Sequence, residues 1–151
     1  MSLRWDETMV LGIEEIDTQH KTIIEEFTLL AEAFQDGHGT ELIQGMIAFL
    51  GEYTQTHFAL EDKYMLKFAY PKIGEQREEH GEFTRDVREL KSSFDQDGAS
   101  REIAFAASGK LIRWIIYHIG NHDREMVAYV LARMAAEHDA DTPVQEDSGG
   151  E

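Results

Sequence analysis

Apolar side chains recur at spacings of three and four residues along four stretches of the chain, which is the pattern of amphipathic helices. Asp36-Gly37-His38-Gly39 interrupts the pattern after the first stretch, and Pro71 follows the second. We expect Ser100 or a neighbour to cap the fourth helix. No stretch shows the period of two that indicates a strand. The predicted helices span about residues 17–35, 39–68, 75–94 and 100–136.

Four helices of roughly 20 residues with short connections predict an all-α fold, an antiparallel up-down-up-down four-helix bundle. Residues 1–12 show no lasting period, and we expect them to form an arm packed on the bundle. The bundle domain is therefore expected to cover residues 1–137. Residues 138–151 are rich in Asp, Glu and Gly, and we expect a disordered acidic tail there.

Each predicted helix carries a histidine on its apolar face. His20 and His80 lie near the starts of the first and third helices, and His57 and His118 lie in the later parts of the second and fourth. Because neighbouring helices of such a bundle run in opposite directions, all four histidines are expected at one level. This alignment favours a shared metal site over four independent core histidines. On the second helix, the predicted inward residues are Leu42, Met46, Phe49, Tyr53, His57, Leu60, Tyr64 and Phe68.

His57 and Glu61 are four residues apart, so on a helix they share one face and could hold one metal ion together. The spacing alone is also typical of an ordinary solvated helix contact. The chain has no cysteine, so any metal must be held by nitrogen and oxygen atoms. Such ligands favour iron, manganese or zinc.

The composition limits the partners. The net charge of −16 disfavours nucleic acid and anionic membrane surfaces, because both would repel the chain. We see neither a signal peptide nor an apolar run of membrane-spanning length, and we expect a soluble, cytoplasmic protein. Ferritin-like di-iron proteins and zinc peptidases are disfavoured because neither Glu-x-x-His nor His-Glu-x-x-His occurs.

Five separated elements resemble the signature of the hemerythrin family in its bacterial single-domain form, and the resemblance covers about residues 3–137. These elements are Asp17-Thr18-Gln19-His20, His57-Phe58-Ala59-Leu60-Glu61-Asp62, Tyr70-Pro71, His80 and His118-Ile119-Gly120-Asn121-His122-Asp123.

The resemblance implies a non-haem centre of two iron ions that binds dioxygen at one iron. It implies that Glu61 and Asp123 bridge the irons together with an oxo or hydroxo group. The iron that takes dioxygen would be bound by His20 and His57, and the other iron by His80 and His118. The residues that resemble the family's dry oxygen pocket are Trp114, Ile115 and Ile119.

One position departs from the family pattern. The family has His-x-x-x-His on the third helix, whereas this chain has Gln76 and His80. Three interpretations compete: Gln76 is a weak metal ligand, water fills the position, or another residue supplies the nitrogen. His122, one turn from His118 and predicted to face inward with it, is the spare histidine nearby, and we expect it to support the ligands from behind rather than to bind metal.

Three functional hypotheses follow. The first is a protein that binds dioxygen reversibly for carriage, storage or sensing and is not an enzyme. The second is a di-iron enzyme or sensor that reacts with oxygen, peroxide or nitric oxide because Gln76 leaves an exchangeable position. The third is a bundle that acts through protein partners bound by its acidic tail; the sequence identifies no such partner.

Overall fold

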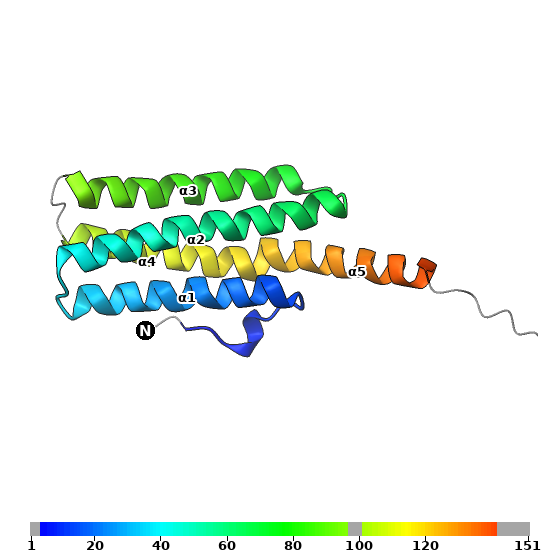
Figure 1. The fold of residues 1–151 in the computed structure, drawn as a ribbon, viewed down its shortest axis with the longest axis horizontal. Helices are drawn as coiled ribbons and strands as arrows, with labels where there is room; N and C mark the ends of the chain where they lie inside the picture. The colour runs from blue at the N-terminus through cyan, green and yellow to red at the C-terminus, as the bar shows by residue number, and fades with distance from the viewer. Residues whose placement is uncertain (1–3, 97–100, 142–151) are drawn as a thin grey trace, which may run out of the picture.

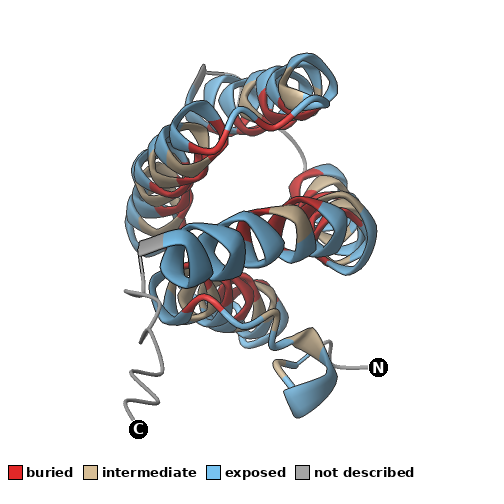
Figure 2. Cartoon of the chain, turned by 90° about the vertical axis from the view of Figure 1, so that its right-hand side faces the viewer, coloured by how far each residue is buried: buried red, intermediate tan, exposed pale blue. Residues whose placement is uncertain are grey.

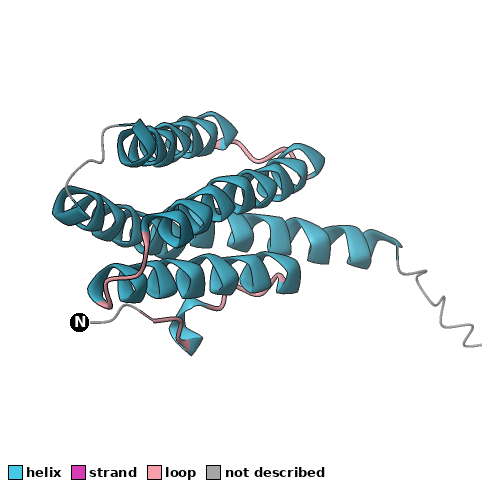
Figure 3. Ribbon diagram, turned by 60° about the vertical axis from the view of Figure 1, so that its left-hand side comes forward, coloured by secondary structure: helices cyan, strands magenta, loops and turns pink. Residues whose placement is uncertain are grey.

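Helices and short connecting turns make up nearly all of the described chain, residues 4–96 and 101–141, in the computed structural model (Figure 3). The predicted all-α four-helix bundle is confirmed. A short 3-10 turn, η1, precedes the main helices, and a π-helical segment, η2, joins the last two. The elements are η1 (Glu7–Met9), α1 (Glu14–Gln35), α2 (Thr40–Lys67), α3 (Ile73–Gln96), α4 (Arg101–His118), η2 (Ile119–Asp123) and α5 (Arg124–Asp141).

The helices lie side by side, and in Figure 1 the chain direction reverses from each helix of the bundle to the next. Helix α2 packs against α1 and α3, and α4 packs against the same two helices. Helices α4 and α5 form one long rod through η2, and the end of α5 extends beyond the other helices (Figure 1). Within the described ranges, none of the helices is both long and apolar enough to span a membrane.

The helix ends follow local backbone chemistry. Helix α1 ends at Gln35, two residues before Gly37, whose φ of +70° is readily adopted only by a residue without a side chain. Helix α2 ends before Ala69, which has a φ of +52°, and the backbone N–H of Tyr70 donates to the carbonyl of Met65 at 2.9 Å. Pro71 then prevents the helix from continuing.

Two predicted boundaries were wrong by a few residues. Helix α1 begins at Glu14 rather than near Asp17, with acidic side chains in its first turn that interact favourably with the helix dipole. Helix α5 continues to Asp141, so residues 138–141 are helical and not part of a tail. The rest of the predicted tail, residues 142–151, and the predicted cap at Ser100 lie outside the described residues.

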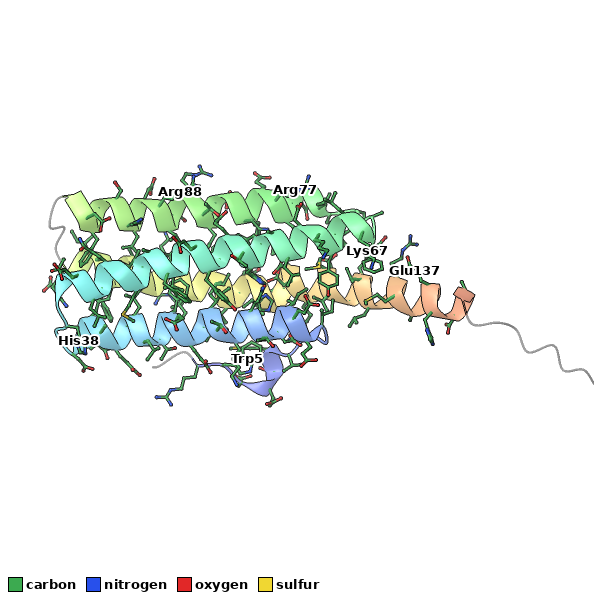
Figure 4. The ribbon with its side chains drawn as sticks, in the orientation of Figure 1. Trp5, His38, Lys67, Arg77, Arg88 and Glu137 are labelled. Carbon is green, nitrogen blue, oxygen red and sulfur yellow. The ribbon has the colours of Figure 1, made fainter. Side chains whose placement is uncertain are left out.

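Two apolar clusters fill the bundle, and buried residues lie on the helix sides that face one another (Figure 2). On α1, Ile23 belongs to the larger cluster and Ile16 to the smaller one, with His20 between them. On α2, Phe58 and Met65 belong to different clusters and flank Glu61. The candidate site therefore lies between two dry layers. On the outer side of α3, in contrast, Figure 4 shows charged side chains such as Arg88.

The prediction of the inward face of α2 was wrong: along most of the helix, each buried residue lies one position after the residue predicted to be inward. Leu42 and Phe49, predicted to be inward, are 51% and 43% exposed. The buried face contains the polar residues Thr54, His57 and Glu61, so a search for apolar spacing selected the neighbouring face. The buried residues of α2 are Ile43, Ile47, Leu50, Thr54, His57, Phe58, Glu61 and Met65.

The N-terminal arm packs on the bundle as predicted. Trp5, Met9 and Leu11 contact the larger apolar cluster, and Figure 4 shows Trp5 beside α1. The carboxylate of Asp17 accepts hydrogen bonds from the backbone N–H groups of Leu11 at 2.8 Å and Gly12 at 3.0 Å, which fixes the entry of the chain into α1.

Gly12 is where we expect a small side chain to be costly. Its φ is +117°, and an added Cβ would lie 3.0 Å from the Cδ1 atom of Leu131. Gly12→Ala should lower the free energy of unfolding in urea by about 1–2 kcal/mol. The matched control is Gly45→Ala, in α2, where an added Cβ meets nothing within 4 Å and should stabilise by about 0.5–1 kcal/mol. Equal effects of the two substitutions would contradict this assignment.

Candidate metal centre

Four imidazoles, one from each helix of the bundle, meet in the layer between the apolar clusters. His20, His57 and His118 are fully buried, and His80 is 7% exposed. The ring centroids of His20 and His57 are 4.5 Å apart, and those of His80 and His118 are 5.3 Å apart. The structure thus brings together the four histidines that the sequence placed at one level.

Two fully buried carboxylates, those of Glu61 and Asp123, lie between the two pairs of imidazoles. Glu61 directs Oε1 to His57 and His20, the latter at 3.3 Å, and its Oε2 lies 3.4 Å from His80 Nε2. Asp123 shows the same division, with Oδ2 at 3.2 Å from His20 Nε2 and Oδ1 at 3.1 Å from His118 Nε2. Each carboxylate therefore offers one oxygen to each side.

These six residues form two overlapping sets of potential metal ligands. Within each set, one atom from every residue lies within 4.8 Å of the others. Glu61 and Asp123 belong to both sets. The first set adds His20 and His57, and the second adds His80 and His118.

The π-helical segment η2 decides which of two neighbouring side chains enters the site. His118 and Asp123 are five residues apart, and on a regular α-helix they would point about 140° apart. Hydrogen bonds of the π type, from residue i to i+5, instead bring Asp123 inward to the same side as His118. The predicted inward position of His122 was therefore wrong: its side chain is 30% exposed, with Nε2 at 3.2 Å from Glu79 Oε1.

Gln76 lies in the site, 1% exposed, at the position where the sequence lacks a histidine. Its Nε2 donates a hydrogen bond to Asp123 Oδ1 at 2.9 Å, while its Oε1 has no partner. Gln76 thus holds one of the two carboxylates shared by both sets.

Buried polar atoms without hydrogen bonds are concentrated here. Across the described side chains, seven such atoms occur, and all belong to the residues that the sequence analysis selected as ligands. Five of the seven lie within ion-pair distance of another group of the site, but not in directions that permit hydrogen bonds. Because buried polar groups normally have partners, a cation among these atoms fits the donor set. The atoms are His20 Nδ1, His57 Nε2, Glu61 Oε2, Gln76 Oε1, His80 Nε2, His118 Nε2 and Asp123 Oδ2.

The charges of the site are strongly coupled. Burial lowers the pKa of His20, but the attraction of the Asp123 and Glu61 carboxylates outweighs burial and raises this pKa from 6.5 to about 9. The pKa of His118 is likewise raised to about 9, against burial, chiefly by Asp123. Burial raises the pKa of Glu61, yet His57, His20 and His80 bring it well below its ordinary value.

The sequence assigned no role to two polar residues at the edge of the site. Gln19 Oε1 accepts a hydrogen bond from His57 Nδ1 at 2.8 Å, and Glu79 Oε2 accepts one from His118 Nδ1 at 2.6 Å. Each directly precedes an inward histidine, so its side chain lies at the seam with the next helix. That position was a signal available in the sequence.

The three residues predicted to line an oxygen pocket do not share the same surroundings. Ile115 and Ile119 are buried in the larger apolar cluster. Trp114 stacks on His118, with ring centroids 4.8 Å apart, and on Phe83, at 4.9 Å. The oxygen-pocket role of these three residues stays a prediction.

Comparison with known proteins agrees with this geometry. Residues 11–130 match the family model for the hemerythrin HHE cation binding domain. The chain belongs to the hemerythrin family. The family resemblance found in the sequence is thereby confirmed.

Among relatives within the hemerythrin family, a bacteriohemerythrin of Pseudomonas paraeruginosa is 34% identical over 133 residues, covering 88% of this chain and 84% of the relative. A bacteriohemerythrin of Stenotrophomonas maltophilia is 30% identical over 139 residues, covering 90% and 88%. A myohemerythrin of Riftia pachyptila is 24% identical over 119 residues, covering 79% and 86%.

The coupled charges predict how the stability of the metal-free protein depends on pH. The raised pKa of His20 and His118 contributes stability that is complete below pH 6.5 and is lost as the pH rises to about 9. The lowered pKa of Glu61 and Asp123 contributes stability that is lost as the pH falls below their ordinary values of 4.5 and 3.8.

The melting temperature of the metal-free protein, followed by circular dichroism, should therefore fall between pH 6.5 and about 9. A bound cation replaces the protons on the imidazoles, so the metal-loaded protein should show a smaller fall. A melting temperature that is constant or rises over this range in the metal-free protein would contradict the charge assignment.

Proposed function

We propose that this site holds two iron ions. The observation that carries the proposal is the unpartnered buried atoms, which converge from every helix of the bundle and form two ligand sets with shared carboxylates. His20 and His57 would hold one ion, and His80 and His118 the other. Glu61 and Asp123, which offer one oxygen to each side, would bridge the two ions with an oxo or hydroxo group.

We further propose that the protein binds dioxygen reversibly and is not an enzyme. Two bound iron ions would supply the electrons for dioxygen binding. The chain would supply the dry surroundings: Ile115 and Ile119, which are close to His118 in the sequence and buried in the larger apolar cluster, would exclude water. The relatives named bacteriohemerythrin and myohemerythrin support this function.

Gln76 favours a second candidate function, that of a di-iron enzyme or sensor that reacts with oxygen, peroxide or nitric oxide. Helix α3 offers one imidazole, that of His80, where the family pattern has two. The Gln76 side chain that stands in place of the other donates its amide N–H to Asp123. The second ion would then have a position open to exchange. Rapid oxidation with turnover would favour this candidate, and repeated cycles of dioxygen binding and release would favour the first.

Glu61→Ala tests the shared carboxylate most directly. Because Glu61 belongs to both ligand sets, its loss should reduce the iron content from about two ions per chain to fewer than one. Iron content measured by atomic emission after loading under nitrogen would show this. His38→Ala is the control, because His38 is exposed and lies outside both sets. Unchanged iron content in Glu61→Ala would refute the assignment, provided that circular dichroism shows a folded variant.

Gln76→His tests the role of the missing imidazole. A nitrogen ligand in this position should bind the second ion more firmly and slow oxidation of the reduced protein in air by roughly tenfold. The rate can be followed by visible absorption in the variant and the unmodified chain. An unchanged or faster rate would mean that residue 76 does not govern the reactivity of the site.

A further inference from the structure

Gln19 and Glu79 occupy equivalent places in the two halves of the bundle. Gln19, on α1, accepts a hydrogen bond from His57 on α2, and Glu79, on α3, accepts one from His118 on α4. In both cases the imidazole donates from Nδ1, so Nε2 is the nitrogen directed into the site and the one available to a metal ion once its proton is displaced. Both residues therefore orient an imidazole so that its Nε2 faces the site.

The two places differ in charge. Gln19 presents a neutral amide oxygen at 2.8 Å, whereas Glu79 presents a carboxylate at the shorter distance of 2.6 Å. A hydrogen bond to a carboxylate is stronger than one to an amide and makes the imidazole a more basic ligand. The stronger partner lies in the half of the bundle that has Gln76 in place of a histidine.

Three neighbours fix His118. Trp114 stacks on its ring with an interplanar angle of 8°, and His122 stacks at 14° with centroids 5.3 Å apart. Glu79 contacts both histidines, with Oε2 on His118 and Oε1 at 3.2 Å from His122 Nε2. The outward-turned His122 thus braces the carboxylate that holds His118.

We propose that Glu79 is a positioning residue that strengthens metal binding by His118 and thereby offsets the imidazole missing at position 76. His122 keeps the carboxylate of Glu79 in place. The inference rests on the proposed two-ion centre. The charge of Glu79 strengthens metal binding in one half of the site only, because Gln19 makes the same contact in the other half without a charge.

The test is a titration of the metal-free, full-length protein with Co²⁺, in which absorption and equilibrium dialysis give two binding constants. Glu79→Gln should weaken one of the two constants by about 10- to 100-fold and leave the other within about twofold. Glu78→Gln is the matched control: it removes the same charge from an exposed position on the same helix and should change neither constant. Gln19→Glu, the reciprocal change, should strengthen the constant that Glu79→Gln leaves unaltered.

The outcomes separate this inference from the proposed function. Fewer than two Co²⁺ ions on the unmodified chain would overturn both. Two ions with Glu79→Gln equal to Glu78→Gln would overturn the role of Glu79 and leave the two-ion centre intact. If Glu79→Gln does not fold by circular dichroism, Gln19→Glu decides, and unchanged constants in that variant would overturn the inference.

Discussion

The contact between two buried carboxylates and four buried imidazoles is the constraint on which the rest of this bundle depends. Glu61 and Asp123 have no exposed surface, and an ionised carboxylate without a partner in such a place would cost several kcal/mol. Each therefore needs positive charge on both sides. The four histidines, the π-helical turn that brings in Asp123 and the amide of Gln76 are all directed to these two groups.

The two halves of the site have the same construction but differ in chemistry. In the half formed by α1 and α2, His57 donates a hydrogen bond to the neutral amide of Gln19. In the half formed by α3 and α4, His118 donates one to the carboxylate of Glu79. The second half also has Gln76, whose Nε2 already donates to Asp123. The missing imidazole at position 76 is the reason for the second candidate function, and the charged partner of His118 lies in the same half of the site.

The four histidines and Glu61 were predictable because helix period and chain direction together decide which residues meet. The inward face of α2 was not, since the polar residues of the site interrupt its apolar pattern and Leu42 and Phe49 imitate an inward stripe. The helix period placed His122 inward, because a period of 3.6 residues does not reveal a π-helical turn; Asp123 was selected through the family resemblance and not through the period. In the sequence, Glu79 differs from its exposed neighbour Glu78 only in that it directly precedes the inward His80.

The visible absorption of the reduced, iron-loaded protein under alternating air and nitrogen is the most direct measurement of the central claim. The account predicts about two iron ions per chain and a charge-transfer band that appears with dioxygen and disappears when dioxygen is removed, over several cycles. A single irreversible conversion to the ferric protein would contradict reversible binding. One iron ion or none per chain would contradict the shared carboxylate centre itself.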